Sequence, residues 1–219
     1  MAKNRRALRE EIVRLLREGN FSGLVDLAGQ ESAVAGQLMM FLFDPRDLLL
    51  WRATEGLGHV GAAHPAQVQK LISRLLYLLN EDSGSSGWGA AAALGEIGRH
   101  KVSLVAEIIP MFYGFLEERY SRAPMLWGVG RLAEVHPELL KEIFPLVPTF
   151  LGDADPLVRA LSAWCLGKAR HQEAAAALEQ LVADANSVEI YEQGDLRQTT
   201  VGQVARQALA GLEIREASR

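Results

Sequence analysis

The sequence predicts an all-α fold in which pairs of helices repeat along the chain. Three observations predict it. Leucines recur about every 36 residues, small residues flank them at fixed offsets, and a second set of apolar columns recurs at the same period. Self-similarity at a period of roughly 20–50 residues is the signature of repeat architectures, in which neighbouring units bury each other's apolar faces.

The first helix of each pair, named helix A, carries one anchor leucine. Each anchor has Ala, Gly or Ser four residues before it and Gly or Ala one residue after it. Offsets of four lie on one face of an α-helix, so small residues there allow a neighbouring helix to approach closely. The anchors are spaced 37, 38, 34 and 43 residues apart, at Leu57, Leu94, Leu132, Leu166 and Leu209.

The second helix, named helix B, ends at an anchor of its own. The residues one, four and eight positions before this anchor are apolar in all four copies, which is a helical stripe. A weaker copy covers residues 173–184. The anchors of helix B are Leu42, Leu79, Leu116 and Leu151.

Residues 85–100, SSGWGAAAALGEIGRH, could be taken for a glycine-rich phosphate-binding loop. A loop of that kind follows a β-strand, and no strand is predicted before these glycines. We therefore expect an inter-repeat turn at 85–87 and a helix A that begins at Trp88, with the alanines and Gly95 on its packing face.

Aspartate–proline and histidine–proline pairs predict the helix boundaries. Asp44 and Asp155 each precede a proline and are expected to be N-caps. His64 and His136 also precede prolines, in the turns from helix A to helix B. Prolines at 110 and 145 occupy one column of helix B and are expected to shape or kink its start in both copies.

Two segments lie outside the regular pattern. Residues 4–18, rich in Arg and Glu, predict a polar capping helix for the first repeat. Residues 187–203 are an insertion that predicts a short β-hairpin near residues 188–199, turning at Gln193-Gly194. Thr200 and Gln203 fit a capping box for the last helix. The insertion either carries a functional site or covers the apolar face of the last repeat, and both alternatives stay open here.

The segments LWRATEGLGHVG, GWGAAAALGEIG, LWGVGRLAEV and DPLVRALSAWCLGKA resemble the first helix of HEAT-like repeats, closest to the bacterial type named after phycobilisome lyases. The resemblance implies a single domain, 1–219. It would be a right-handed α-solenoid of about five helix pairs over 21–214, the last incomplete, with B helices on the concave side. Such repeats often carry an Asp…Arg pair that links neighbours. Only the fourth copy keeps it cleanly, in Asp153, Asp155 and Arg159, where other copies have Leu50, Gly87, Met125 and Gly202 in the arginine column.

Composition disfavours several classes of function. The net charge of −4 and pI of about 5.8 argue against a general nucleic-acid binder. A single cysteine, Cys165, excludes an internal disulfide or a cysteine metal cluster. No uncharged apolar run approaches the roughly 18–20 residues that span a bilayer, and the first twenty residues are too charged for a secretory signal. We expect a cytoplasmic protein with no membrane segment.

Candidate chemistry is sparse. The five histidines fall near turns about one repeat apart, which favours structural roles over a metal site. No paired carboxylates and no Ser/His/Asp or Cys/His set stands out, so we expect no cofactor, no metal and no catalytic residue, and a protein that is not an enzyme. A constellation assembled in space from distant residues stays open at this point.

The candidate site is the side of helix B opposite its apolar columns. A ridge that contains Met40, Tyr77, Met111 and Leu146 would be more apolar than an ordinary solvated face, and Met and Tyr are favoured at interfaces. The alternative is that these side chains pack on the next repeat or are exposed singly. The predicted partner-binding residues are Gln37, Met40, Lys70, Arg74, Tyr77, Glu107, Met111, Leu146 and Thr149.

Three functions are therefore weighed. The first is a non-enzymatic scaffold or adaptor that binds another protein along the concave groove. The resemblance implies the other two, a chaperone-like accessory subunit of a cofactor-attaching lyase and a HEAT-like alkylpurine DNA glycosylase, which would hold damaged DNA with Trp and Asp. A row of basic residues is compatible with DNA binding: Arg99, Lys101, Arg119, Arg122 and Arg131. The four Trp, however, lie on A helices, which are expected on the convex side and not in the groove. A basic concave face would favour DNA binding. A deep pocket with a carboxylate would favour catalysis, and a shallow apolar groove with a mixed-charge rim would favour a protein partner.

Overall fold

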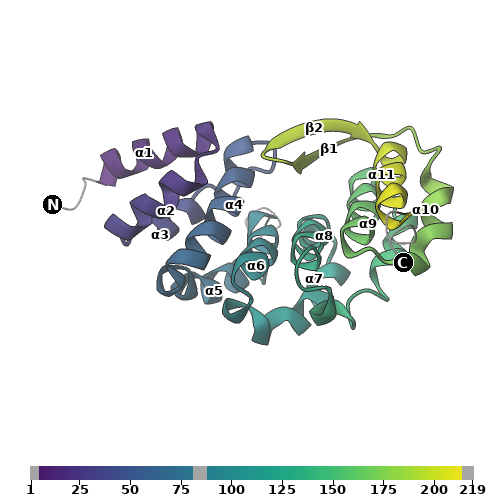
Figure 1. The fold of residues 1–219 in the computed structure, drawn as a ribbon, viewed down its shortest axis with the longest axis horizontal. Helices are drawn as coiled ribbons and strands as arrows, with labels where there is room; N and C mark the ends of the chain where they lie inside the picture. The colour runs from purple at the N-terminus through teal and green to yellow at the C-terminus, as the bar shows by residue number, and fades with distance from the viewer. Residues whose placement is uncertain (1–4, 81–87, 214–219) are drawn as a thin grey trace. The chain divides into compact units, whose positions relative to one another are not determined.

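The protein is all-α with one small two-stranded sheet, as the computed structural model shows (Figure 1). The structure describes residues 5–80 and 88–213. Its internal contacts divide the chain into two compact units, Met1–Glu107 and Ile108–Arg219. Each unit consists of stacked helix pairs of the α-solenoid class, which confirms the predicted fold class. The prediction of one domain over 1–219 stays a prediction.

The first unit contains six α-helices and one short 3₁₀ helix among its described residues. The expected capping helix is present as α1, and α4 and α6 are the A helices that carry Leu57 and Leu94. The elements are α1 Arg5–Glu18, α2 Phe21–Gln30, α3 Val34–Met39, α4 Leu48–Ala63, α5 Pro65–Leu79, α6 Trp88–His100 and η1 Val102–Leu104.

Helices α4 and α6 pack directly on each other, as the small-residue columns predict. Leu57 and Leu94 are completely buried. A Cβ atom at Gly58 would lie 2.6 Å from the His100 ring and 3.0 Å from the backbone oxygen of Glu96. Only glycine fits at this distance, so Gly58 sets the close approach of the two helices.

The glycine-rich stretch is packing and not a ligand loop. Helix α6 begins at Trp88, and its alanines 90–93 are completely buried. The Gly89 amide donates a hydrogen bond of 3.1 Å to the Leu42 carbonyl oxygen. A Cβ at Gly89 would lie 2.7 Å from that oxygen, so this glycine serves helix contact. The predicted turn at 85–87 lies outside the described residues.

The second unit continues the pattern of helix pairs and ends in a hairpin and a last helix. The 3₁₀ helix η2, Ala106–Met111, spans the division between the units. The elements that follow are α7 Phe112–Glu117, α8 Arg119–Ala133, η3 Pro137–Leu140, η4 Val147–Gly152, α9 Pro156–Ala169, η5 Gln172–Ala174, α10 Ala175–Leu181, β1 Ser187–Glu192, β2 Asp195–Thr200 and α11 Val201–Glu213.

Two of the expected B helices are not continuous α-helices. The third copy is 3₁₀ helix around Pro110 before α7 begins, and the fourth consists of η3, turns and η4. Pro145 and Pro148 fall inside the expected helix, where they remove backbone N–H donors and clash with the preceding turn, so a regular helix is disfavoured there. The apolar columns nevertheless stay buried, since Ile143, Val147 and Leu151 are at most 5% exposed.

The A helices of the second unit pack in sequence, with α8 against α9 and α9 against α11. Leu132 and Leu166 are completely buried. In α11 the predicted flanking positions Ala205 and Leu212 are buried, while the anchor Leu209 is only partly buried and the neighbouring Ala208 lies against Gly167.

The predicted caps are mostly confirmed. Asp155 accepts a hydrogen bond from the Leu157 amide as N-cap of α9, and Pro65 begins α5 after His64. Thr200 and Gln203 form the reciprocal capping box at the start of α11. The expectation for Asp44 was wrong. Its carboxylate accepts from the Arg46 amide in a turn, and Asp47 is the N-cap of α4.

The insertion is a β-hairpin, as predicted. Strands β1 and β2 are antiparallel, with Ser187 opposite Thr200 and Glu192 opposite Asp195. The two turn residues, Gln193 and Gly194, both have positive φ, which is the conformation that a tight two-residue hairpin turn requires. Val188, Ile190 and Tyr191 of β1 are buried, and β1 contacts α9.

Candidate protein-binding surface

The nine residues predicted to face outward from the B helices do so. Tyr77 is 63% exposed, Met40 45% and Met111 44%, which is high for large apolar side chains. Gln37 and Leu146 are partly exposed, and the other four are exposed. Six of the nine belong to the first unit and three, Met111, Leu146 and Thr149, to the second. Their role in binding a partner stays a prediction.

In the first unit, four of the predicted residues line one groove. Gln37 and Met40 come from the C-terminal end of α3 and the residue after it, and Lys70 and Arg74 from α5. The groove has a volume of about 880 Å³. Helix α3 contacts both α1 and α5, so the groove lies over α3 with a helix on each side. Tyr77 and Glu107 do not line it.

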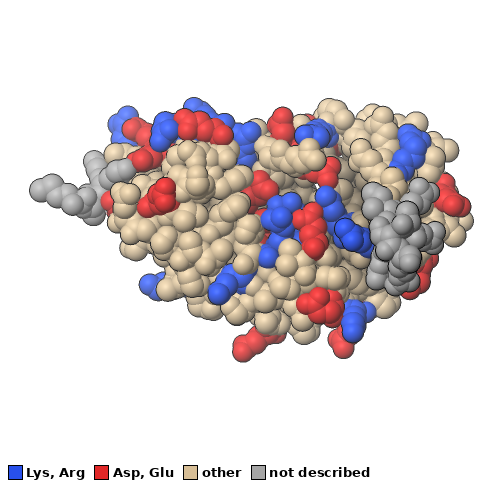
Figure 2. Space-filling view, viewed as in Figure 1, with Lys and Arg blue, Asp and Glu red and all other residues tan. Residues whose placement is uncertain are grey.

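Sequence reasoning missed the other wall of this groove. Arg5, Arg6 and Arg9 of α1 line it opposite the α5 side chains, although the sequence had assigned them only to a polar cap. The signal was present as two arginines at positions i and i+4, which place their side chains on one helix face. Figure 2 shows basic and acidic side chains close together along α1. One of these pairs is Arg6 with Glu10, at 2.9 Å.

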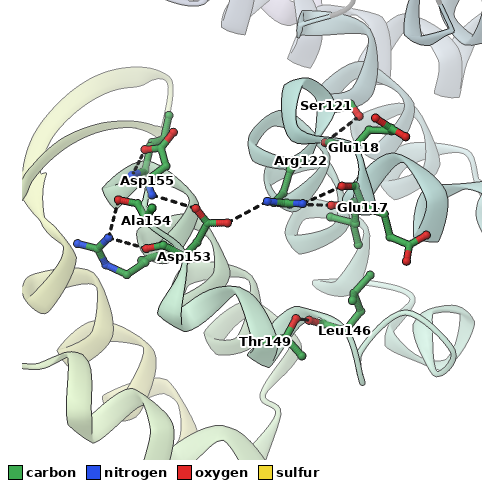
Figure 3. A network of polar contacts seen from close by, with 12 residues as sticks. Glu117, Glu118, Ser121, Arg122, Leu146, Thr149, Asp153, Ala154 and Asp155 are labelled. Atoms are coloured by element: carbon green, nitrogen blue, oxygen red, sulfur yellow. Dashed lines mark hydrogen bonds and ion pairs between the residues drawn. The ribbon is translucent and has the colours of Figure 1, made fainter.

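In the second unit, the predicted residues lie on short irregular elements. The Thr149 hydroxyl donates a hydrogen bond of 2.6 Å to the carbonyl oxygen of Leu146, the residue that precedes η4 (Figure 3). Met111 directly follows Pro110 at the end of η2. The positions of Met111 and Thr149 therefore depend on the backbone of the short helices η2 and η4.

A network of Asp and Arg side chains joins the repeats of the second unit (Figure 3). Arg122 Nη1 lies 2.9 Å from Asp153 Oδ2. The same guanidinium donates to the carbonyl oxygens of Leu116 and Glu117, at the end of α7. The expectation that only the fourth copy keeps this link was wrong, because Arg122 makes it from a position three residues before the expected column.

Arg159 makes the equivalent link one repeat later. It donates to the carbonyl oxygens of Asp153 and Ala154, and its Nη2 lies 2.8 Å from Asp184 Oδ2. Burial alone would raise the pKa of Asp184, but hydrogen bonds from Asn186 and Arg159 outweigh it and hold this pKa below its ordinary value. The carboxylate is therefore charged in the folded protein at neutral pH.

The three tryptophans whose side chains the structure describes are part of the core. Trp51, Trp127 and Trp164 are at most 6% exposed. The rings of Trp127 and Trp164 are stacked, with their centroids 6.2 Å apart, and the Trp127 indole N–H donates a hydrogen bond to the Tyr191 carbonyl oxygen. Trp164 donates to the Glu192 carboxylate, which also lies 3.0 Å from Lys168 Nζ. These contacts attach the hairpin to α8 and α9.

A buried carboxylate lies between α4 and α6, and no sequence pattern predicted its burial. Glu96 is completely buried, with its Oε1 3.0 Å from His100 Nε2 and 3.3 Å from Arg99 Nη1. The His100 ring also contacts the His59 ring, with their centroids 4.4 Å apart and their planes tilted by 50°. Partnered in this way, Glu96 has a structural role in the contact between the two helices.

The remaining candidate residues have structural surroundings too. His64 bonds to the Val25 carbonyl oxygen, and His136 and His171 each lie 3.5 Å from a nearby glutamate. In the part of the chain that the structure describes, no group of three His, Cys, Asp or Glu side chains could hold a metal ion. Cys165 is completely buried, and burial raises the pKa of its thiol far above the ordinary value.

Comparison with known proteins agrees with this geometry. A family model described as a HEAT-like repeat matches residues 120–169, which run from α8 through η3 and η4 to α9. An uncharacterised protein of Archaeoglobus fulgidus is 28% identical over 138 residues, which cover 61% of this chain and 74% of the relative. Among the described helices, none is long and apolar enough to cross a membrane.

Proposed function

We propose that the protein is a non-enzymatic scaffold or adaptor that binds a partner protein along the exposed side of its B helices. One observation carries the proposal. The B segments bury their apolar columns and still leave Met40, Tyr77 and Met111 at least 44% exposed. Large adaptable and aromatic side chains exposed in this way are typical of interaction surfaces. The composition adds the expectation of a cytoplasmic location.

The mechanism is preorganisation. The Arg–Asp links, the buried glycine contacts between A helices and the docked hairpin fix the elements that carry the surface within each unit. A surface that is already ordered loses little conformational entropy when it binds. A modest set of contacts is then enough for a specific complex.

The two alternatives have less support. A DNA glycosylase of this kind would present exposed Trp and Asp side chains, whereas Trp51, Trp127 and Trp164 are buried and the groove of the first unit has no carboxylate among its lining residues. No contact of the described residues favours an accessory subunit of a lyase. That alternative depends on the resemblance alone.

An affinity pull-down from the native cell tests the proposal. The ridge variant Tyr77→Ala with Met111→Asp is compared with wild type and with a control, Tyr120→Ala with Val135→Asp. The control changes side chains that are 71% and 50% exposed but belong to α8 and the segment after it. A protein lost only with the ridge variant supports the proposal. Equal capture by all three folded proteins contradicts it.

A further inference from the structure

We propose that the groove between α1, α3 and α5, named the basic groove, binds an acidic peptide segment of the partner protein. This inference depends on the proposed function and identifies the chemistry of the partner. Arg5, Arg6, Arg9, Lys70 and Arg74 line the groove, and none of the described residues that line it is acidic. Five cations around one concave site are unusual in a chain whose net charge is −4.

The cations are available to a ligand. Among the described residues, Arg5, Lys70 and Arg74 have no ion pair, and Arg9 lies over the Phe41 ring at 4.9 Å. Arg6 pairs with Glu10, and these side chains are 87% and 65% exposed, where an ion pair contributes little; the inference depends on the other four cations. Charges that are not neutralised within the protein raise the local concentration of anions.

The arrangement suits an extended acidic segment. Arg5 and Arg9 are one helical turn apart on α1, and Lys70 and Arg74 are one turn apart on α5. The groove therefore has a row of two cations on each side of α3. Arginine binds carboxylates through two parallel hydrogen bonds, so carboxylates along a bound peptide can pair with both rows.

The floor of the groove leaves space for a peptide backbone. Gly36 lies in the middle of α3, where a Cβ would meet no atom within 4 Å. Glycine inside a helix is less stable than alanine, so a glycine that no neighbouring atom requires needs another explanation. Close approach of another backbone to the helix is a common one. Met40 and Leu71 line the same groove and offer an adaptable apolar surface.

A peptide fits these observations better than a nucleic acid. Among the described residues that line the groove none is aromatic, so they offer bases no stacking surface. A volume of about 880 Å³ accommodates a short segment of chain. The acidic remainder of the protein would repel a long phosphate backbone.

Fluorescence anisotropy with a labelled peptide of alternating Glu and Leu, about ten residues long, tests the inference. A Lys/Leu peptide of equal length and a duplex DNA serve as comparison probes. We expect wild type to bind the Glu/Leu peptide, more weakly as salt rises. Lys70→Glu with Arg74→Glu should lower the affinity by roughly tenfold or more. The control Lys101→Glu with Arg119→Glu makes the same change in net charge at exposed residues outside the groove and should bind as wild type does.

Gly36→Leu separates binding from folding. This variant fills the floor of the groove without changing charge, and leucine favours helix more than glycine does, so it should be no less stable and should lose peptide binding. No binding by wild type, equal loss in the charge control, or tighter binding of duplex DNA would each overturn the inference. If peptide binding fails while the ridge variant still loses a partner in the pull-down, the basic groove is wrong and the proposed function stands.

Discussion

Arg122 joins two successive repeats by pairing with Asp153 across 2.9 Å, while it also holds the carbonyl oxygens at the end of α7. Arg159 repeats this arrangement with Asp184 and the end of η4. Each arginine thus caps one B segment and binds the aspartate that follows the next one. The pairs are at least 80% buried and carry hydrogen bonds on both partners, so they differ from ordinary surface ion pairs.

The Arg122–Asp153 pair should contribute measurable coupling to stability. Arg122→Gln should lower the free energy of unfolding by about 2 kcal/mol, because it leaves a partly buried carboxylate and two carbonyl oxygens without their donor. A double-mutant cycle with Asp153→Asn, measured by urea unfolding, should give a coupling energy of about 0.5–3 kcal/mol. The exposed pair of Arg46 with Asp44 is the control and should give almost none. Additive effects at 122 and 153 would mean that the link is not formed.

Acid should weaken the second unit through two carboxylates. Burial alone would raise the pKa of Glu192, but hydrogen bonds from Lys168 and Trp164 outweigh it and lower this pKa, and the pKa of Asp184 is lowered too. A carboxyl whose pKa is lower in the folded state stabilises the fold above its ordinary pKa, which is 3.8 for Asp and 4.5 for Glu. That stability is lost as pH falls through the lower folded value.

Glu192→Gln with Asp184→Asn should therefore reduce stability at pH 7 and make it less dependent on pH below about 4.5. Thermal unfolding between pH 7 and pH 3 measures this. Parallel curves for the variant and wild type would contradict the assigned pKa directions.

Gly130 should be indispensable to the contact of α8 with α9. A Cβ at this position would overlap the Trp164 ring, which itself stacks on Trp127 and cannot easily move. Gly130→Ala should lower the free energy of unfolding by about 1–3 kcal/mol, as overpacking does. Gly114→Ala in α7, where a Cβ meets nothing within 4 Å, should leave stability unchanged or raise it by up to about 1 kcal/mol. A milder effect at Gly130 than at Gly114 would contradict the packing described here.

Leu94→Ala tests the repeat register. This side chain is completely buried on α6, and its truncation should cost about 2–5 kcal/mol. Leu139→Ala removes a leucine that is 41% exposed and should change stability by less than about 0.5 kcal/mol. The two melting temperatures give the comparison, and an unchanged value for Leu94→Ala would mean that the anchor column is misplaced.

The sequence predicted the fold class because two apolar columns repeat at one period, and a pattern of that kind depends only on local helix geometry. It failed where another force outweighs the period. Prolines 145 and 148 convert an expected B helix into turns and 3₁₀ helix while Val147 keeps its buried place. In the last helix, Leu209 is only partly buried although Ala205 and Leu212 of the same pattern are buried.

The candidate surface was predictable in part. The exposure of Met40 and Tyr77 follows from the helix period, because the opposite face is filled with apolar residues. The basic groove does not follow from any single helix, since Arg5 and Arg74 are 69 positions apart in the chain and meet only through α3. The burial of Glu96 is also non-local in origin, because it depends on how closely α4 and α6 approach, although its partners Arg99 and His100 are on its own helix.

Site-specific photo-cross-linking in the native cell tests the central claim most directly. A photoreactive phenylalanine analogue replaces Tyr77 on α5 in one variant and Tyr120 on α8 in another, both of them exposed tyrosines at 63% and 71%. If the B helices bind a partner protein, a discrete cross-linked protein should form at position 77 and be absent at position 120. Cross-linking at 120 alone, or at neither position in a folded protein, would contradict the account.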